Sequence, residues 1–250
     1  MIAKFINLIG HKTIHVTLSY FEAMLFASLS IINIFIPSNY TSNIYTLLIK
    51  QIYQTSIKAI PQFILMAAIF GSIVIGLLIV IASDFNLQIQ IGSIIVNFAI
   101  KELAPLLTAF FIAYLFSPLI YMQASLLNLK SQTQALHDVI IPRILSTIIS
   151  TITLSILFSM IMLASGYLFV FFIMGMDVHT YEYLIFSSFD IYNIFILLTK
   201  SSIFGFIVAV IPLYNGLITL KPKHTTSKIF VILFFIEFLS LFIQKATNAI

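Results

Sequence analysis

Long runs without a charged side chain constrain the fold of this sequence more than any other feature. Three such runs lie inside Lys58–Asp84, Glu102–Lys130 and Arg143–Asp177. About 20 apolar residues in a helix cross the roughly 30 Å hydrocarbon core of a bilayer, because each residue adds about 1.5 Å. Each run is therefore long enough to form one transmembrane helix.

Two further spans follow in the last third of the chain. The uncharged runs inside Asp190–Lys200 and Lys200–Lys221 predict a fourth span that is interrupted by one lysine, and the shorter fifth span, Ile229–Ile243, contains Glu237. The residues are 61% hydrophobic and 8% charged, whereas soluble domains carry about 25% charged residues. We predict an all-α integral membrane protein with five transmembrane helices.

The N-terminal segment has two interpretations. His15–Ile36 is apolar, but it contains Glu22 and several Ser, Thr and Asn residues. It is either a sixth span or an amphipathic helix lying in the membrane interface. We favour the interfacial helix, because a sixth span would disturb the charge distribution described below. Tyr40–Ser56 is then a short amphipathic connector.

These segments are expected to form a single domain. Residues 1–56 make its interfacial region and residues 57–250 its transmembrane core. No cleavable signal peptide is expected, because polar residues interrupt the first stretch of the chain.

The basic residues predict the orientation. With five spans and a cytoplasmic N-terminus, one basic residue, Lys245, lies in an outside segment. The segments on the cytoplasmic side contain Lys4, Lys12, Lys50, Lys58, Lys130, Arg143, Lys221, Lys223 and Lys228. Because cytoplasmic segments of membrane proteins are enriched in Lys and Arg, the C-terminus is expected on the outer side.

An adjacent pair of charges, Lys101 and Glu102, lies inside the apolar stretch Ile91–Met122. A charge in hydrocarbon costs about 3 kcal/mol or more, so such residues indicate a functional site or a buried ion pair. Neighbouring helix positions do not face each other, and Lys200 in the fourth span is the candidate partner of Glu102. Two interpretations stay open: a structural ion pair, or a polar site in a cavity that meets a charged headgroup or ion.

Glu237 is a further intramembrane acid, with either a hydrogen-bonded structural role or a proton-coupled one. No cofactor or metal is predicted, because the chain has no cysteine, its five histidines are scattered, and its eight glycines form no phosphate-binding loop. No basic patch suggests nucleic-acid binding.

Several motifs resemble the MlaE (YrbE) family of ABC-transporter permeases. Lys101–Ala109 (KELAPLLTA) is similar to the family's Arg/Lys-Glu-Leu-Gly-Pro-Val-Leu-Thr-Ala, and Lys130–Leu136 to its Thr-Glu-Gln-Ile-Asp-Ala-Leu. Pro142-Arg143, Lys200–Gly205 (KSSIFG) and Asn215-Gly216 also match family motifs in order. The family layout of an interfacial helix and five spans agrees with the charge distribution.

The resemblance implies a permease subunit of an MCE-type transporter for phospholipids or related lipids. The implied partners are a second copy of the chain, a cytoplasmic ATPase that hydrolyses ATP, an MCE-domain lipid-binding protein and phospholipid. The implied location is the cell inner membrane, with a periplasmic C-terminus. Lys101, Glu102 and Lys200 would bind substrate, and Asn215 is a further intramembrane polar residue.

In the family, the segment corresponding to Leu129–Arg143 forms the helix that docks on the ATPase. The predicted coupling residues are Lys130, Gln132, Gln134, Asp138 and Arg143. The chain is several residues shorter here than the family pattern, and family glutamates are replaced by Ser131 and Gln123. These departures predict weakened coupling or a divergent ATPase.

Two other functions remain as alternatives. A proton-channel subunit of a rotary ATPase would be similar in length, but it needs an arginine in a late span, and the only arginine is Arg143. A membrane scaffold without transport activity is the second alternative.

Overall fold

The computed structural model describes residues 21–40, 42–85, 90–129, 139–175, 177–218 and 225–247. Helices dominate these ranges, and no strand occurs within them. The helices are α2 (Ser42–Thr55), α3 (Ile60–Asp84), α4 (Ile91–Ile94), the π-helix η4 (Ile95–Leu103), α5 (Ala104–Ser125), α7 (Ile141–Met174), α8 (Val178–Phe186), α9 (Ile191–Ile218) and α10 (Thr225–Thr247).

Five helical rods are long and apolar enough to cross a membrane, as predicted. They are Asn43–Ala82, Ile91–Ser125, Ile141–Ile173, Ile191–Ile218 and Thr225–Ala246. The last is longer than expected, because it includes Lys228 and Lys245 near its two ends. Lysines at helix ends extend their charged heads to the interface, so they do not shorten a span. The chain is a multi-pass membrane protein.

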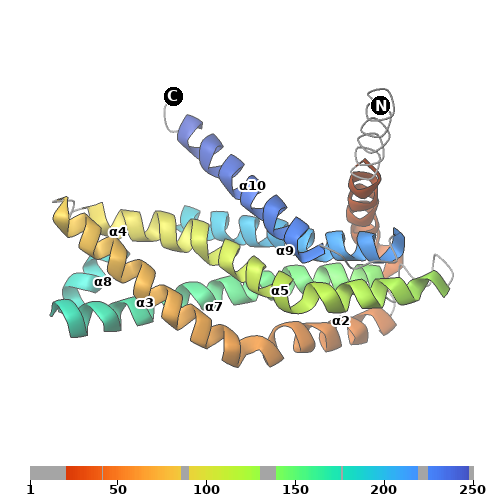
Figure 1. Ribbon diagram of the computed structural model, residues 1–250, viewed down its shortest axis with the longest axis horizontal. Coiled ribbons are helices and arrows are strands. Elements are labelled where there is room, and N and C mark those ends of the chain that lie inside the picture. The colour runs from red at the N-terminus through yellow and green to blue at the C-terminus, as the bar shows by residue number, and fades with distance from the viewer. Residues whose placement is uncertain are drawn as a thin grey trace, which may run out of the picture.

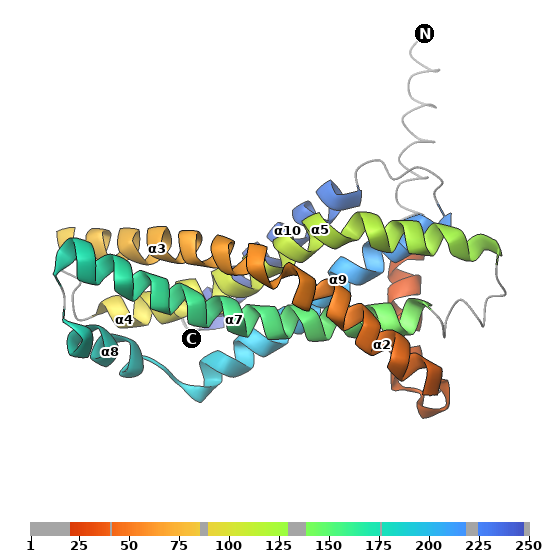
Figure 2. The same ribbon diagram turned by 90° about the horizontal axis from the view of Figure 1, so that it is seen from below.

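The first rod is bent. The 3₁₀ turn η2 (Ile57–Ala59) joins α2 to α3 within this rod. The division of the domain at residue 56 stays a prediction. Figure 2 shows α2 turning away from the line of α3 while both stay against α7. Ser56 donates a hydrogen bond to Ser150 Oγ at 2.7 Å, and Ser146 donates to Gln51 Oε1 at 3.2 Å. These bonds fasten α2 to the start of α7.

Helix α7 begins and ends at residues suited to those positions. Pro142 lies in its first turn, where the missing N–H group costs no hydrogen bond. Gly175 ends the helix in the left-handed conformation, with φ 65°, and donates a hydrogen bond to the carbonyl of Phe171 at 3.2 Å.

The core forms where α5 packs along α9, α3 along α7, and α7 along α9. Helix α10 contacts α5 and α9 but diverges from the bundle along its length (Figure 1). Only 17% of its most apolar 18-residue stretch is buried inside the bundle, so most of the surface of α10 faces lipid or another protein.

A shorter apolar helix, Phe21–Phe35, precedes these rods. It stands across the long axis of the bundle (Figure 1), which is the orientation of an interfacial helix next to spanning helices. Tyr214 near the end of α9 donates a hydrogen bond to the Glu22 carboxylate at 3.1 Å. The acidic residue that argued against a sixth span therefore binds the end of a spanning helix.

The charged residues outside the interior are distributed unevenly along the bundle. Lys50 lies on α2, Lys58 at the bend that follows α2, and Lys228 near the start of α10. We call the half of the bundle that contains α2 the basic end (Figure 1). At the opposite end, the acidic end, α3 finishes and α8 packs against α4. Asp84 ends α3, Asp177 precedes α8, Glu182 lies within α8, and Asp190 precedes α9.

Gly205 allows α7 and α9 to approach closely. A Cβ atom at this position would lie 2.9 Å from the Cα of Ile148 and would also clash with Thr151 Oγ1. Replacing Gly205 with alanine is expected to destabilise the protein by about 1–3 kcal/mol, because the backbone of α7 must move. Thermal unfolding in detergent would measure this loss. Ile203→Ala on the exposed face of α9 is the control, and equal effects of the two variants would contradict the close-packing account.

Candidate functional site

Three charged side chains from three helices meet in the apolar interior. Lys200 Nζ on α9 contacts the carboxylate of Glu102 on η4, and it lies 3.3 Å from Glu237 Oε1 on α10. Their exposed fractions are 8%, 4% and 5%, respectively. The predicted partnership of Glu102 and Lys200 is confirmed, and Glu237 joins it as a second carboxylate.

The three helices bring these residues to the same depth. Glu102 and Lys200 each lie about ten residues from the acidic end of their helices, Ile91 and Ile191, which is roughly 15 Å. Glu237 lies about as far before Thr247, the end of α10. Because opposite charges at equal depth attract strongly in a low-dielectric medium, this geometry holds η4, α9 and α10 together.

Lys101 is the fourth charge of this cluster. It is attracted by the carboxylate of Glu102 and repelled by the ammonium of Lys200. With Lys101 included, the two lysines and two glutamates have a formal charge of zero. Lys101 is partly exposed, whereas the other three side chains are buried. Within the described ranges it forms neither an ion pair nor a hydrogen bond. Its ammonium is therefore the member of the cluster that can bind a group from outside.

The backbone around Lys101 and Glu102 is a π-helix. The N–H of Ala104 donates to the carbonyl of Ala99, five residues earlier. Pro105 follows, and a proline ring clashes with the carbonyl four residues before it in a normal α-helix. The wider π turn removes this clash, and π-helical segments occur frequently at functional sites.

The remaining predicted site residues lie elsewhere. Asn215 is buried near the end of α9 and donates to Thr225 Oγ1 at 3.4 Å, linking α9 to α10. Arg143 is 2% exposed inside the bundle at the start of α7. The predicted coupling role of Arg143 stays a prediction, and its guanidinium lies in the interior rather than on the surface. The other predicted coupling residues, which lie outside the described ranges, are Lys130, Gln132, Gln134 and Asp138.

The sequence analysis missed the polar residues around Arg143. Gln54, Lys58, Gln62 and Gln123 line a cavity together with it. The signal in the sequence was weak, because glutamines are neutral and lie near the ends of three different helices. Only the packing of α2, α5 and α7 shows that they share one space.

Comparison with known proteins agrees with this architecture. The family model described as Permease MlaE matches residues 48–243. The chain is 27% identical over 229 residues to the intermembrane phospholipid transport system permease protein MlaE of Haemophilus influenzae, covering 86% of this chain and 85% of that protein. It is 24% identical over 225 residues, with the same coverage, to a probable ABC transporter permease protein of Rickettsia bellii.

The matched region contains the whole Lys101, Glu102, Lys200 and Glu237 cluster, three of the five rods entirely and most of the other two. The match decides between the permease and the rotary-ATPase subunit in favour of the permease. The chain belongs to the MlaE permease family.

Proposed function

We propose that this chain is the membrane subunit of an ABC transporter that moves phospholipid between membranes, and that Lys101 contacts the lipid phosphate. The observation that carries this proposal is the charge cluster at membrane depth. Lys200, Glu102 and Glu237 pair with one another in the interior, and the partly exposed Lys101, which completes the charge balance, has no ion-pair partner of its own in the described ranges. An ammonium is a common ligand for phosphate.

Family membership and the phospholipid named for the Haemophilus relative support lipid as the substrate. Glu102 and Glu237 hold Lys200 in place. The positive charge of Lys200 offsets part of the negative charge of the two carboxylates, which reduces their repulsion of a lipid phosphate. Glu102 also balances the neighbouring ammonium of Lys101 when no lipid is bound.

The transporter needs further subunits in this proposal. ATP hydrolysis takes place on a separate ABC ATPase at the basic end, and an MCE-domain lipid-binding protein receives or delivers lipid at the acidic end. Two copies of the chain form the membrane core. Helix α10 supports a homodimer, because its exposed face carries large apolar side chains along its length: Val231, Phe234, Phe235, Phe238, Leu239 and Phe242.

The charge distribution supports an orientation in the cell inner membrane. Lys50 and Lys58 lie at the basic end, which we place in the cytoplasm according to the positive-inside rule. The end of α10, and with it the C-terminus, is then periplasmic. In this orientation Lys101 lies closer to the periplasmic surface, where lipid would enter or leave.

Lys101→Gln tests the phosphate contact. The variant keeps a polar side chain but loses the charge, and a hydrogen bond to a charged group contributes about 1.5–3 kcal/mol. We expect the phospholipid that copurifies with the protein to fall about tenfold. Phosphorus assay or mass spectrometry of the purified protein would measure it.

Lys245→Gln is the matched control, because Lys245 is an exposed lysine in the last turn of α10. It is expected to leave the bound lipid unchanged. Wild-type amounts of phospholipid on the Lys101→Gln protein would show that the phosphate contact is assigned to the wrong residue.

A further inference from the structure

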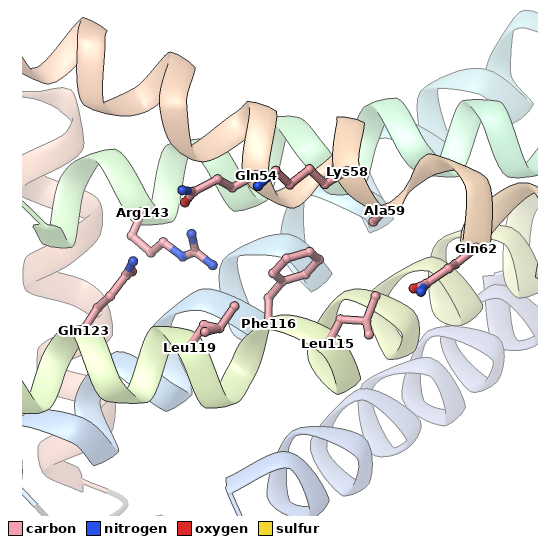
Figure 3. A pocket seen from close by; sticks show the side chains of 9 residues that line it. All are labelled: Gln54, Lys58, Ala59, Gln62, Leu115, Phe116, Leu119, Gln123 and Arg143. Atoms are coloured by element: carbon pink, nitrogen blue, oxygen red, sulfur yellow. The ribbon is translucent and has the colours of Figure 1, made fainter.

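A polar cavity of about 480 Å³ opens between the α2–α3 bend, α5 and the start of α7. Figure 3 shows Gln54 and Lys58 from the first rod, Gln123 from α5 and Arg143 from α7 pointing into this space. A second cavity of about 400 Å³ shares Gln54 and Gln123 with the first and adds Lys50. The two cavities are therefore neighbours at the basic end, with Gln54 and Gln123 lining both.

Arg143 is the largest fully buried side chain of the structure, with 2% exposure. Its Nε and Nη2 atoms are buried and have no hydrogen-bond partner in the described ranges. A buried cation without a partner costs several kcal/mol, so natural proteins pair such groups with an anion. Arg143 also lines the cavity, while its unpartnered Nε and Nη2 atoms are covered by neighbouring atoms.

The lining described by the structure supplies cations but no anion. Lys50, Lys58 and Arg143 contribute three positive charges, and the two cavities have no carboxylate among their lining residues. The amide of Gln123 has an unpartnered oxygen, but a neutral amide cannot neutralise a guanidinium, whichever way it is turned. Among the described lining residues, no carboxylate balances the charge of Arg143.

The cavity is separate from the charge cluster of Lys101 and Lys200. Phe116, which lines the cavity, follows Glu102 by fourteen residues on the same rod, or about 20 Å. The two sites also lie toward opposite ends of the bundle. A ligand of this cavity is therefore not the lipid phosphate proposed for Lys101.

The apolar part of the lining indicates which anion fits. Leu115, Phe116 and Leu119 of α5 border the same cavity, and Leu119 is 51% exposed. A phospholipid presents a phosphate next to acyl chains, and basic pockets between membrane helices recognise such headgroups. A guanidinium binds phosphate oxygens through two parallel hydrogen bonds.

We propose that this cavity binds the phosphate group of an anionic phospholipid from the leaflet at the basic end. Arg143 binds the phosphate oxygens, Lys58 and Lys50 add charge, and Leu119 contacts the start of an acyl chain. The bound lipid neutralises Arg143 and fills the space between α2, α5 and α7. This site does not depend on the transport function proposed above.

The test compares lipid binding by native mass spectrometry, with the purified 250-residue chain titrated with phosphatidylglycerol or phosphatidylcholine. The wild type is expected to prefer phosphatidylglycerol. Gln123→Glu places an internal carboxylate beside Arg143 without removing any cation, so it is expected to weaken phosphatidylglycerol binding about tenfold. Gln123→Met, which adds no charge, is expected to keep the preference.

Arg143→Gln and Lys58→Gln are expected to weaken phosphatidylglycerol binding in the same direction. Because Arg143→Gln alters the interior, the conclusion rests on Gln123→Glu and Lys58→Gln if that variant does not fold. Phosphatidylcholine, which carries the same phosphate but no net charge, serves as the internal reference, and its binding is expected to fall less than that of phosphatidylglycerol.

Inorganic phosphate distinguishes the two sources of a phosphate group. If the headgroup is the ligand, millimolar phosphate neither displaces phosphatidylglycerol nor raises the unfolding midpoint. If free phosphate is the ligand, it raises the midpoint of the wild type but not of Gln123→Glu, which would overturn the lipid assignment. An equal affinity of wild type and Gln123→Glu for phosphatidylglycerol would overturn the lipid site. That result is expected if Arg143 is neutralised by a carboxylate of a partner protein and not by a lipid.

Discussion

Lys200→Met is expected to destabilise the protein by about 3–5 kcal/mol, because it leaves Glu102 and Glu237 buried without their ammonium partner. Methionine has nearly the length of lysine, so the change removes charge more than volume. For a chain of this size the loss corresponds to a drop of about 10 °C in the unfolding midpoint. Thermal denaturation followed by size-exclusion chromatography in detergent would measure it.

Two controls separate charge from packing at this position. Lys200→Arg keeps a cation between the carboxylates and is expected to restore most of the stability. Ile203→Ala, one turn away on the exposed face of α9, should change the midpoint little. If Lys200→Met unfolded at the wild-type temperature, the three-helix charge cluster would not stabilise the bundle.

The second large effect is expected from neutralising both carboxylates. Glu237→Gln alone leaves the direct contact between Lys200 and Glu102, and Glu102→Gln alone leaves Glu237 at 3.3 Å. Each single change is therefore expected to cost about 1–2 kcal/mol. The double change isolates a buried ammonium and is expected to cost about 3–5 kcal/mol.

The two single variants and the double variant form a double-mutant cycle. The loss of stability in the double variant beyond the sum of the two single losses measures how far one carboxylate substitutes for the other. We expect an excess of about 1 kcal/mol or more. Strict additivity would mean that each carboxylate interacts with Lys200 independently of the other. Adding Lys200→Met to the double variant should recover stability, since no charge then remains at this depth except Lys101.

The spans could be predicted because their physical basis lies in the chain itself. Uncharged runs between Lys58 and Asp177 have the length that a bilayer requires. The contact of Glu102 with Lys200 followed from the same reasoning, since a buried charge needs an opposite charge in another span. Glu237 was recognised as an intramembrane acid, but its place beside Lys200 depends on how α10 packs.

Other features depend on three-dimensional packing and left little trace in the sequence. The π-helix around Lys101 arises from the combination of Pro105 and the contacts of η4 with α9. The cavity at Arg143 requires residues from α2, α5 and α7 that lie far apart in the chain. The sequence alone showed Arg143 as the first charge of a span and placed it at a cytoplasmic surface.

The central claim is that the chain passes phospholipid through a site at Lys101. The most direct measurement is ATP-dependent transfer of labelled phospholipid by proteoliposomes that contain the chain with the ATPase and the MCE-domain protein proposed as its partners. The wild type and Lys245→Gln are expected to transfer lipid at equal rates, and Lys101→Gln about tenfold more slowly. Transfer that is unchanged in Lys101→Gln, or the absence of ATP-dependent transfer by the wild type, would contradict the account.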